Sequence, residues 1–340
     1  MRSPLRSRLF HLLLGLTALT LVAAACSSSD DEESLTLYSG RSEDLIGPLI
    51  EDFTEETGIE VEVKYLGSAE AALLIAEEGD QTPADVFISQ SPGAMGFLES
   101  SGQLADLDSA TLDLVDAGVR DADGKWVGLS GRQRVLVYNE DGVTADELPS
   151  SVFDLTDPAW SGRLGIAPAN GSFQDFVTAM RGSVGDDVTL EWLTALRENG
   201  VVTYSGNSAI VAAVGRGEVD AGLVNHYYNF RALAEDDSLP SRNHQLAVDD
   251  PGSVLIVTAA AVIAGNESDA ATSLVDFLLS EAAQRYFADE TFEYPLAAGV
   301  APADGIPAAE FDGVGDDTLG GLGDELEGTR NLIVEAGFEG

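Results

Sequence analysis

The sequence predicts an α/β protein of two lobes that form a hinged clamshell with a cleft between them. Near the N-terminus, strand-like and helix-like segments alternate in the order β-α-β-α-β, which favours a mostly parallel sheet covered by helices on both faces. A second alternating block follows after residue 160. Residues 253–264 then form one β-rich run that is long enough to pass from one lobe to the other.

In the first block, residues 35–38 predict a short strand and 39–42 the turn into a helix. Apolar residues recur at helical spacing from Leu45 to Phe53, and Gly58 ends that helix. Residues 59–65 alternate apolar with charged side chains, as a strand does. A helix over 69–78 and a buried strand over 84–89 complete the block.

Between the two blocks, strand-like runs at 126–129 and 134–139 are joined by the polar residues 130–133. The later elements are expected as strands at 163–167, 201–204 and 219–224 and as helices at 173–181, 190–198, 209–214, 227–234, 269–279, 281–288 and 329–336. A glycine-rich acidic loop spans 312–328. We expect the first lobe to contain 35–132 and 258–308, and the second lobe 133–257 and 309–340.

The strands near 133–138 and 254–258 are expected to cross between the lobes as the hinge. Ligands of open α/β sheets lie beyond the carboxyl ends of the strands, where helix N-termini offer free N–H groups. In a clamshell these ends face the cleft, and closure buries the solute.

The N-terminus has the pattern of an export signal. Residues 1–25 combine three arginines with an apolar run that is too short for a stable membrane span. Three alanines, Ala23 to Ala25, precede Cys26, the single cysteine, which predicts a lipobox with an acylated thiol. Residues 26–34 would then be a polar tether from a lipid anchor on the outer face of the cell membrane, or in the periplasm. The alternative is an ordinary secretory signal with an incidental cysteine.

Composition excludes several functions. The chain has 59 acidic and 17 basic residues, a net charge of −42, which disfavours nucleic acid and anionic membrane surfaces as partners. It contains no nucleophile elbow, zinc-protease motif, P-loop or dinucleotide fingerprint. Beyond the leader only His226 and His244 are available as bases, so we do not expect an enzyme.

The residues with the clearest chemistry are Tyr227 and Tyr228, which follow the apolar segment 219–224. Adjacent side chains of a strand point to opposite faces, but at a strand-to-helix turn they can converge. Phenolate is a hard oxygen donor that suits Fe(III). Its pKa near 10 is no barrier, because a strongly charged metal binds the deprotonated form at neutral pH. The alternative is two aromatic rings that pack at the start of a helix.

Several separated motifs occur in a characteristic order over almost the whole chain. They are YSGR at 38–41, TPADVF at 82–87, WVGLSGRQRVLVYN at 126–139, NGSF at 170–173, GNSAIVAAV at 206–214, GEVDAGLVNHYYNF at 217–230, DPG at 250–252 and EYPLAAGV at 293–300. In these motifs the chain resembles the ferric-ion-binding proteins of bacterial iron ABC importers, which are type II periplasmic binding proteins, also called bacterial transferrins. The resemblance implies a monomeric receptor that delivers Fe(III) to a permease and its ATPase.

The resemblance also implies a site. Tyr227 and Tyr228 stand where the family's iron-binding pair stands, and an oxyanion, phosphate or carbonate, would complete the coordination. Residues 170–172 precede an expected helix, so their N–H groups and a hydroxyl can face an anion. The anion-binding residues implied in this way are Asn170, Gly171, Ser172, Asn207 and Asn225.

Two positions depart from the family pattern. Ser42 and Gln90 stand where many members have a histidine and a glutamate ligand, and neither is a good donor to Fe(III). Candidate substitutes as metal ligands are Glu43 and Tyr138. Arg41 and Arg132 are candidates for balancing the charge of the anion.

Two other functions remain open. The same fold could bind an oxyanion or a small organic anion directly, without iron. A surface-anchored hydrolase would instead require His226 or His244 beside a nucleophilic hydroxyl, a pairing that the sequence does not offer.

Overall fold

The computed structural model describes residues 34–90, 92–297, 299–308 and 322–338. They belong to one compact unit, Glu33–Gly340. The expected signal peptide, Cys26 and the tether lie outside the described residues, except for Ser34, which begins the first strand. The expected acidic loop lies largely outside them as well.

The first half of the chain forms the α/β block that the sequence predicts. Its elements are β1 (Ser34–Ser39), α1 (Glu43–Thr57), β2 (Glu60–Tyr65), α2 (Ser68–Glu78), β3 (Val86–Ser89), α3 (Pro92–Ser100) and α4 (Ser109–Leu112). One face of α1 buries Ile46, Leu49, Ile50 and Phe53, and Gly58 ends the helix in the left-handed conformation at φ 77°. β1 pairs in parallel with both β2 and β3.

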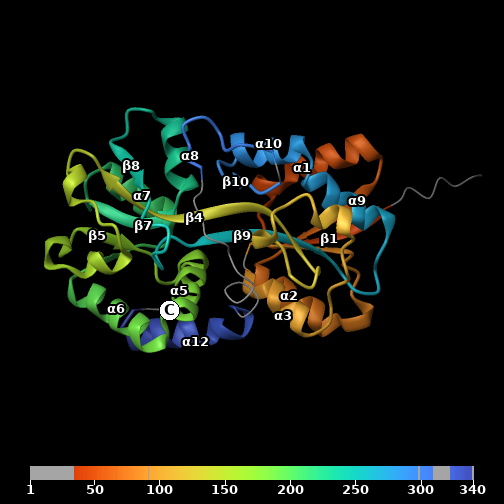
Figure 1. The fold of residues 1–340 in the computed structure, drawn as a ribbon, viewed down its shortest axis with the longest axis horizontal. Helices are drawn as coiled ribbons and strands as arrows, with labels where there is room; N and C mark the ends of the chain where they lie inside the picture. Colours follow the sequence, from red (N-terminus) through yellow and green to blue (C-terminus); the bar gives the residue numbers. More distant parts are fainter. Residues whose placement is uncertain (1–33, 91, 298, 309–321, 339–340) are drawn as a thin grey trace, which may run out of the picture. The chain divides into compact units, whose positions relative to one another are not determined.

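Two long strands cross from this block to the rest of the chain (Figure 1). β4 (Val127–Asn139) runs antiparallel to β9 (Leu255–Val262) over its first half, and to β7 (Ala221–Asn225) and β8 (Ser241–His244) over its second. The sequence predicted two strands here with a polar joint at 130–133. That prediction was wrong, because the polar side chains of this joint are buried within one continuous strand.

The second half of the chain repeats the alternation. Its elements are β5 (Leu164–Ile166), α5 (Gly171–Val184), α6 (Asp186–Glu198), β6 (Val202–Thr203), α7 (Asn207–Gly215), β7, α8 (Tyr227–Glu235) and β8, and after β9 come α9 (Asp269–Leu278), α10 (Glu281–Asp289), β10 (Tyr294–Pro295) and α12 (Leu322–Glu335). Short 3₁₀ helices span Gly79–Gln81, Ala117–Val119, Ala145–Glu147, Val152–Thr156 and Pro158–Trp160.

All of these strands belong to one sheet system. The order is β2-β1-β3-β9-β4-β7-β5-β6, and β8 and β10 also pair with β4. Consequently β4 and β9 lie at the centre of the order, and the parallel strands of each half lie to either side. Polar groups placed at the middle of β4 are therefore held between the two halves of the chain.

Hydrophobic side chains form separate cores on the two sides of these central strands. One cluster includes Leu37, Phe53 and Phe87 from the first half. In the second half, Leu136 joins a cluster on one face of the sheet, whereas Val135 joins a cluster on the opposite face. Burial of these apolar surfaces supplies the main driving force for folding. The boundaries between the lobes at 132/133 and 257/258 stay a prediction.

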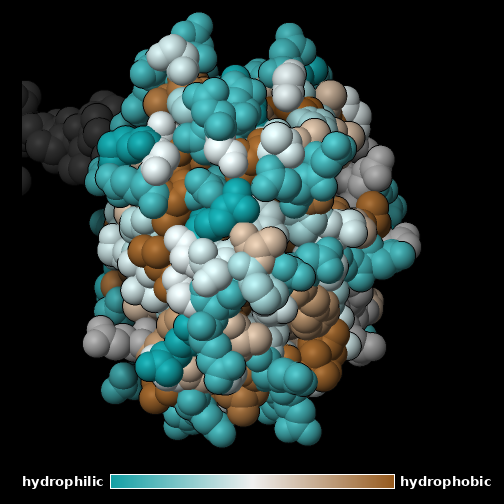
Figure 2. Space-filling model, turned by 90° about the vertical axis from the view of Figure 1, so that its left-hand side faces the viewer, coloured by the Kyte–Doolittle hydropathy of each residue, from teal (hydrophilic) through white to brown (hydrophobic). Residues whose placement is uncertain are grey.

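One face of the molecule is largely hydrophilic. In the face shown in Figure 2, hydrophilic residues dominate and hydrophobic residues are scattered in small groups among them. Among the described residues, no helix is both long and apolar enough to cross a bilayer.

Candidate ligand-binding site

The tyrosine pair lies where β7 passes into α8. β7 ends at Asn225, and α8 begins at Tyr227 after a single connecting residue. The turn stacks the rings of Tyr227 and Tyr228, with centroids 4.3 Å apart and planes inclined by 26°. Tyr227 is only 4 % exposed and Tyr228 is half-buried. The strand-to-helix turn therefore brings both phenols to one place.

Tyr227 is a neutral phenol when no cation is bound. Burial raises its pKa well above 10, the negative charge of an ionised Tyr228 raises it further, and Arg132 opposes the shift. Desolvation disfavours the charged form of any acid, so only a nearby cation makes the phenolate favourable. Ionisation of Tyr227 is thus coupled to the binding of a positive ion.

Two cavities meet at the tyrosine pair. The larger, about 740 Å³, is lined by Ser42 and Asp44 at the start of α1 and by side chains of α7 and α8. The smaller, about 370 Å³, is lined by Gln90 and Arg132 on one side and by residues at the start of α5 on the other. Tyr227 and Tyr228 line both cavities. A ligand held by the phenols would be in contact with both spaces.

The start of α5 provides polar groups to the smaller cavity. Asn170 caps the helix, because its Oδ1 accepts from the Ser172 N–H at 3.2 Å and from the Ser172 hydroxyl at 2.7 Å. Asn207 Nδ2 donates to Asn170 Oδ1 at 3.2 Å and to Ser172 Oγ at 3.0 Å. Asn170, Gly171, Ser172 and Asn225 all line the cavity, whereas Asn207 supports them from behind. Four of the five expected anion-binding residues are therefore at its wall.

Sequence reasoning missed Arg134, which lies directly behind this wall. It is fully buried, and its Nη1 donates to Asn225 Oδ1 at 3.1 Å and to Ser172 Oγ and Asn207 Oδ1 at 3.4 Å each. Among the described residues, Arg134 Nε and Nη2 and Asn225 Nδ2 have no hydrogen-bond partner. Burial lowers the pKa of Arg134 to about 9, so the guanidinium is still positive at neutral pH. A charged residue inside the apolar run 134–139 was the available indication.

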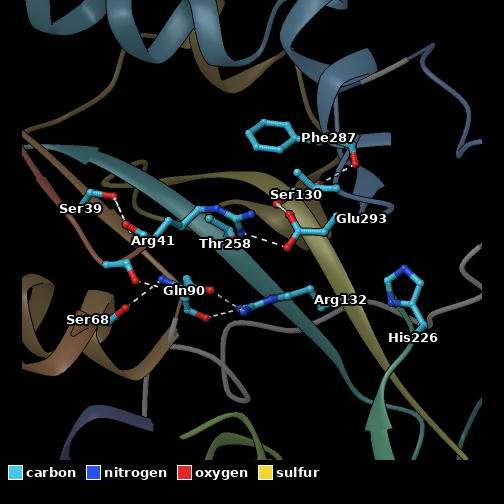
Figure 3. Close-up of polar contacts among 12 residues, drawn as sticks. Ser39, Arg41, Ser68, Gln90, Ser130, Arg132, His226, Thr258, Phe287 and Glu293 are labelled. Atoms are coloured by element: carbon cyan, nitrogen blue, oxygen red, sulfur yellow. Dashed lines mark hydrogen bonds and ion pairs between the residues drawn. The ribbon is translucent and has the colours of Figure 1, made fainter. Parts of the chain in front are cut away.

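The expectation that Arg41 balances the charge of an anion was wrong. Its Nη1 lies 3.0 Å from Glu293 Oε1 and donates to Thr258 Oγ1 at 3.1 Å, and the guanidinium lies over the Phe287 ring (Figure 3). Arg41 is fully buried and lines neither cavity at the tyrosine pair. Its charge is balanced by a carboxylate, Glu293, that sequence reasoning did not single out.

Arg132, in contrast, lines the smaller cavity. It is 3 % exposed, its Nη1 donates to Gln90 Oε1 at 3.2 Å and its Nη2 donates to the Gln90 carbonyl oxygen. Figure 3 shows the side chain extending from β4 toward Gln90. The positive charge of Arg132 opposes part of the rise in the pKa of Tyr227 that burial causes.

The two candidate substitutes for the missing metal ligands lie elsewhere. Tyr138 pairs with Ala221 at the far end of β7, and its ring packs against the same core as Leu136, on the face of the sheet opposite to that of Tyr228. Glu43 is exposed at the start of α1 and lines neither cavity. Its neighbour Asp44 does line the larger one.

The histidines are not arranged for catalysis. His226 is buried, its Nδ1 accepts from the Gln133 N–H at 3.1 Å, and its ring stacks on Tyr294 with centroids 4.3 Å apart. Burial lowers its pKa to about 4, so it is neutral at physiological pH. His244 Nε2 lies 2.7 Å from the carbonyl oxygen of Pro149. Neither described histidine is bonded to a hydroxyl side chain, which argues against the hydrolase alternative.

The described residues also contain no cluster of three or more histidine, cysteine, aspartate or glutamate side chains that could hold a metal ion. A metal at this site would depend on the phenols.

Comparison with known proteins gives consistent matches. Residues 81–317 match the sequence profile of a family described as bacterial extracellular solute-binding protein. The chain is 34 % identical to the major ferric iron-binding protein of Neisseria meningitidis, over 81 % of this chain and 85 % of that one. It is 30 % identical to the Fe(3+)-binding periplasmic protein of Serratia marcescens, over 83 % and 84 % of the two chains.

Among solved structures, iron-bound HitA from Pseudomonas aeruginosa is similar, with 34 % identity, a TM-score of 0.81 and coverage of 90 % of this chain and 100 % of that one. Trichodesmium IdiA (FutA), solved with iron and citrate, has 26 % identity, a TM-score of 0.78 and the same coverage. The predicted two-lobed α/β fold of type II periplasmic binding proteins is confirmed by these matches.

Proposed function

The chain belongs to the bacterial extracellular solute-binding protein family, and from this premise we propose that its solute is Fe(III), captured with a synergistic oxyanion and delivered to an ABC permease and its ATPase. The similar proteins of Neisseria and Serratia are named for binding ferric iron, which supports this cargo. The protein binds and releases the solute without changing it covalently.

The proposal rests on one observation: the stacked phenols lie beside a cavity whose lining includes a hydrogen-bond donor without a partner, Nδ2 of Asn225. Tyr227 and Tyr228 are the metal ligands, and each loses its proton to become an anionic oxygen donor. The raised pKa of Tyr227 keeps this phenol neutral until a cation arrives. Because Fe(III) carries three charges, it compensates the desolvation that penalises the phenolate. Binding therefore releases protons.

Phosphate or carbonate is the co-ligand in the smaller cavity. Asn225, whose Nδ2 has no partner among the described residues, and Ser172 line this space, and Gly171 adds one backbone N–H at the start of α5. Arg134 supplies a positive charge behind them. Buried donors without partners are costly, and an anion that accepts from them removes that cost.

The site lies between groups from the two halves of the chain, which supports capture by closure and release by opening. Gln90 comes from the first half, and Tyr228 and Ser172 come from the second. Opening on the permease would separate these groups and weaken binding. We further propose a monomer, exported and attached through acylated Cys26 to the outer face of the membrane or retained in the periplasm.

The proposal is tested by titrating the purified protein with ferric nitrilotriacetate in the presence of phosphate. We expect a visible phenolate-to-iron charge-transfer band that disappears in the double variant Tyr227→Phe, Tyr228→Phe. Each single variant should weaken iron binding by more than roughly 100-fold, because losing even an outer-shell partner of a metal ligand costs about 10–100-fold. Tyr138→Phe is the matched control, because Tyr138 lies on the opposite face of the sheet, and it should keep the band.

A second candidate is the same fold binding an oxyanion without iron, which the buried positive charge of Arg134 favours. In that case phosphate alone would raise the melting temperature while ferric nitrilotriacetate with phosphate produced no band. The Arg134→Gln variant would lose the stabilisation by phosphate in either case, so the band decides between the two functions.

A further inference from the structure

A buried ring from β10 stacks on the turn that carries the tyrosine pair. Tyr294 lies against His226, with ring centroids 4.3 Å apart and planes inclined by 19°. His226 is 1 % and Tyr294 is 3 % exposed. His226 is the single residue between β7 and α8, and the next residue in the chain is Tyr227. The stack therefore ends directly beside a proposed metal ligand.

The two ends of this contact belong to different cores. Tyr294 is part of the core that contains Leu37, and β10 pairs with the first half of β4. Tyr228, which follows the same turn, packs against the core that contains Val135. The contact between Tyr294 and His226 therefore makes the position of the turn depend on a residue that is held in the other core.

Gln133 on β4 fixes the orientation of both rings. Its backbone N–H donates to His226 Nδ1 at 3.1 Å, and its carbonyl oxygen accepts from the His226 N–H at 2.9 Å. Its Oε1 accepts from the Tyr294 hydroxyl at 3.4 Å and from Gln245 Nε2 at 2.8 Å, and its Nε2 donates to Ser253 Oγ at 3.0 Å. Because a backbone N–H can only donate, Nδ1 is the accepting nitrogen, and the His226 ring is held in one orientation.

The backbone just before Tyr294 is strained. Among the described residues other than glycine, Phe292 alone lies in the left-handed region, at φ 58°. An aromatic residue rarely adopts this conformation, and such strain persists only where the surrounding structure holds the chain in place. The two residues that follow are both held by specific partners, because Glu293 pairs with Arg41 and Tyr294 stacks on His226.

Ring contacts extend from His226 to the tyrosine pair. The His226 ring meets the Tyr227 ring edge-on, with centroids 6.1 Å apart and planes inclined by 89°. Tyr227 in turn stacks on Tyr228. Asn243 Nδ2 donates to the His226 carbonyl oxygen at 2.8 Å, which also fixes the backbone of the turn. Four rings therefore form a continuous series from Tyr294 to Tyr228.

Resting on the proposed function, we infer that Tyr294 is a positioning residue for iron binding: through its stack on His226 it sets the direction in which the Tyr227 phenolate meets the metal. Groups that hold a metal ligand in place contribute to affinity although they do not touch the metal. A stacked aromatic pair has a modest energy, so we expect its loss to weaken iron binding by about 3–10-fold.

The test uses the full mature protein loaded with ferric nitrilotriacetate and phosphate. It measures the charge-transfer band and the rate at which excess EDTA removes the iron. Tyr294→Leu should shift the band maximum and raise the removal rate by about 3–10-fold. Tyr294→Phe keeps the stacked ring and should recover most of the unmodified behaviour. A change in the band reports the geometry of the phenolate, which a general loss of stability does not alter.

His226→Gln removes the other ring of the stack but keeps an acceptor for the Gln133 N–H, and it should reproduce both changes. Because the two substitutions remove the same contact, adding Tyr294→Leu to His226→Gln should have little further effect on the removal rate. His226→Gln also provides the comparison if Tyr294→Leu does not fold, since an unchanged band and rate in this variant would equally overturn the inference.

Tyr286→Leu is the matched control. Tyr286 packs against the same core as Tyr294, and its described ring contact is with Phe287 rather than with His226. The substitution should lower the midpoint of urea unfolding and leave the band and the removal rate unchanged.

Each other result has a distinct meaning. An unchanged band and removal rate in Tyr294→Leu would overturn the inference and leave the proposed function intact. Equal changes in Tyr286→Leu would also overturn it, because they would reflect a general loss of packing. Full additivity of Tyr294→Leu and His226→Gln would do so as well, by showing that the two residues act separately. Absence of the band in the unmodified protein would instead show that the proposed function itself is wrong.

Discussion

Replacing Glu293 by glutamine removes the buried carboxylate that faces Arg41 and Arg132. Its Oε1 lies 3.0 Å from Arg41 Nη1 and its Oε2 accepts from the Ser130 hydroxyl at 2.7 Å. Burial by itself would raise the pKa of Glu293, but Arg41 and Arg132 outweigh it and the pKa is lowered. Breaking a buried ion pair by removing one partner typically costs about 3–5 kcal/mol, because the other charge stays buried and uncompensated. We expect a loss of that size for Glu293→Gln.

Urea unfolding of the ligand-free protein at pH 7 measures this loss as a shift of the midpoint at constant slope. The double variant Arg41→Met, Glu293→Gln should recover most of the stability, because it removes both charges together. Glu218→Gln is the control: its ion pair with Arg216 is exposed, so the midpoint should hardly move.

The loss should also depend on pH with a defined sign. Because folding lowers the pKa of Glu293 below its ordinary value of 4.5, the stabilisation is complete above pH 4.5 and disappears as the pH falls through the folded-state pKa. A loss below ~1 kcal/mol at pH 7, or a double variant no more stable than the single one, would refute the reasoning from buried charge.

Three further predictions concern the site and its surroundings. The ligand-free protein should lose about 3 kcal/mol of stability as the pH falls from about 6.5 to about 4, because His226 takes up a proton in the unfolded chain before it does so in the folded protein. In urea unfolding, the His226→Asn variant should lack this part of the pH profile. Iron binding should release protons and tighten as the pH rises from 5 to 7, because the raised pKa of Tyr227 keeps it a phenol beforehand. Calorimetry in buffers of different ionisation enthalpy measures the release, and a pH-independent affinity would contradict it. Asn207→Ala should weaken phosphate binding by about 10-fold, because it removes the hydrogen bond that Asn207 Nδ2 donates to Ser172 Oγ. Equal phosphate affinity in the variant and the unmodified protein would show that this bond is unnecessary.

Local patterns predicted the parts of the site that depend on neighbouring residues. An apolar strand followed directly by two tyrosines and a helix fixes where both phenols lie, and the structure stacks them there. Asn170 followed by Gly171 and Ser172 likewise predicts a helix start with exposed N–H groups, and α5 begins at Gly171. In both cases a single turn determines the geometry.

Strand alternation held information that remained unused. Tyr138 is an even number of residues from Leu136, so both side chains point to the same face of β4, which is the face away from Tyr228. The same alternation places Arg134 with Leu136, pointing to the face covered by Phe173 and Phe176, over which its guanidinium lies. Because Arg132 and Arg134 share this face and lie at or behind the smaller cavity, alternation alone does not exclude Tyr138; its place near the end of β4, paired with Ala221, does.

The buried charges could not be predicted in this way. Glu293 is more than 160 residues from Ser130 in the sequence, and only the pairing of β10 with β4 brings them together. Gln90 meets Arg132 for a similar reason, because β3, which ends just before Gln90, and β4, which carries Arg132, both pair with β9. A local sequence pattern shows neither that such a residue is buried nor which residue it contacts. For this reason the polar residues 130–133 of β4 were predicted as a joint between two strands.

The central claim is that the two adjacent phenols bind Fe(III) at the edge of an anion pocket. A crystal structure of the protein loaded with ferric nitrilotriacetate and phosphate, with anomalous data collected at the iron edge, tests it most directly. We predict one strong anomalous peak within bonding distance of the hydroxyl oxygens of both Tyr227 and Tyr228, and anion density against Ser172 and Asn225. A peak at the exposed carboxylates of the larger cavity, or no peak while phosphate occupies the pocket, would contradict the claim.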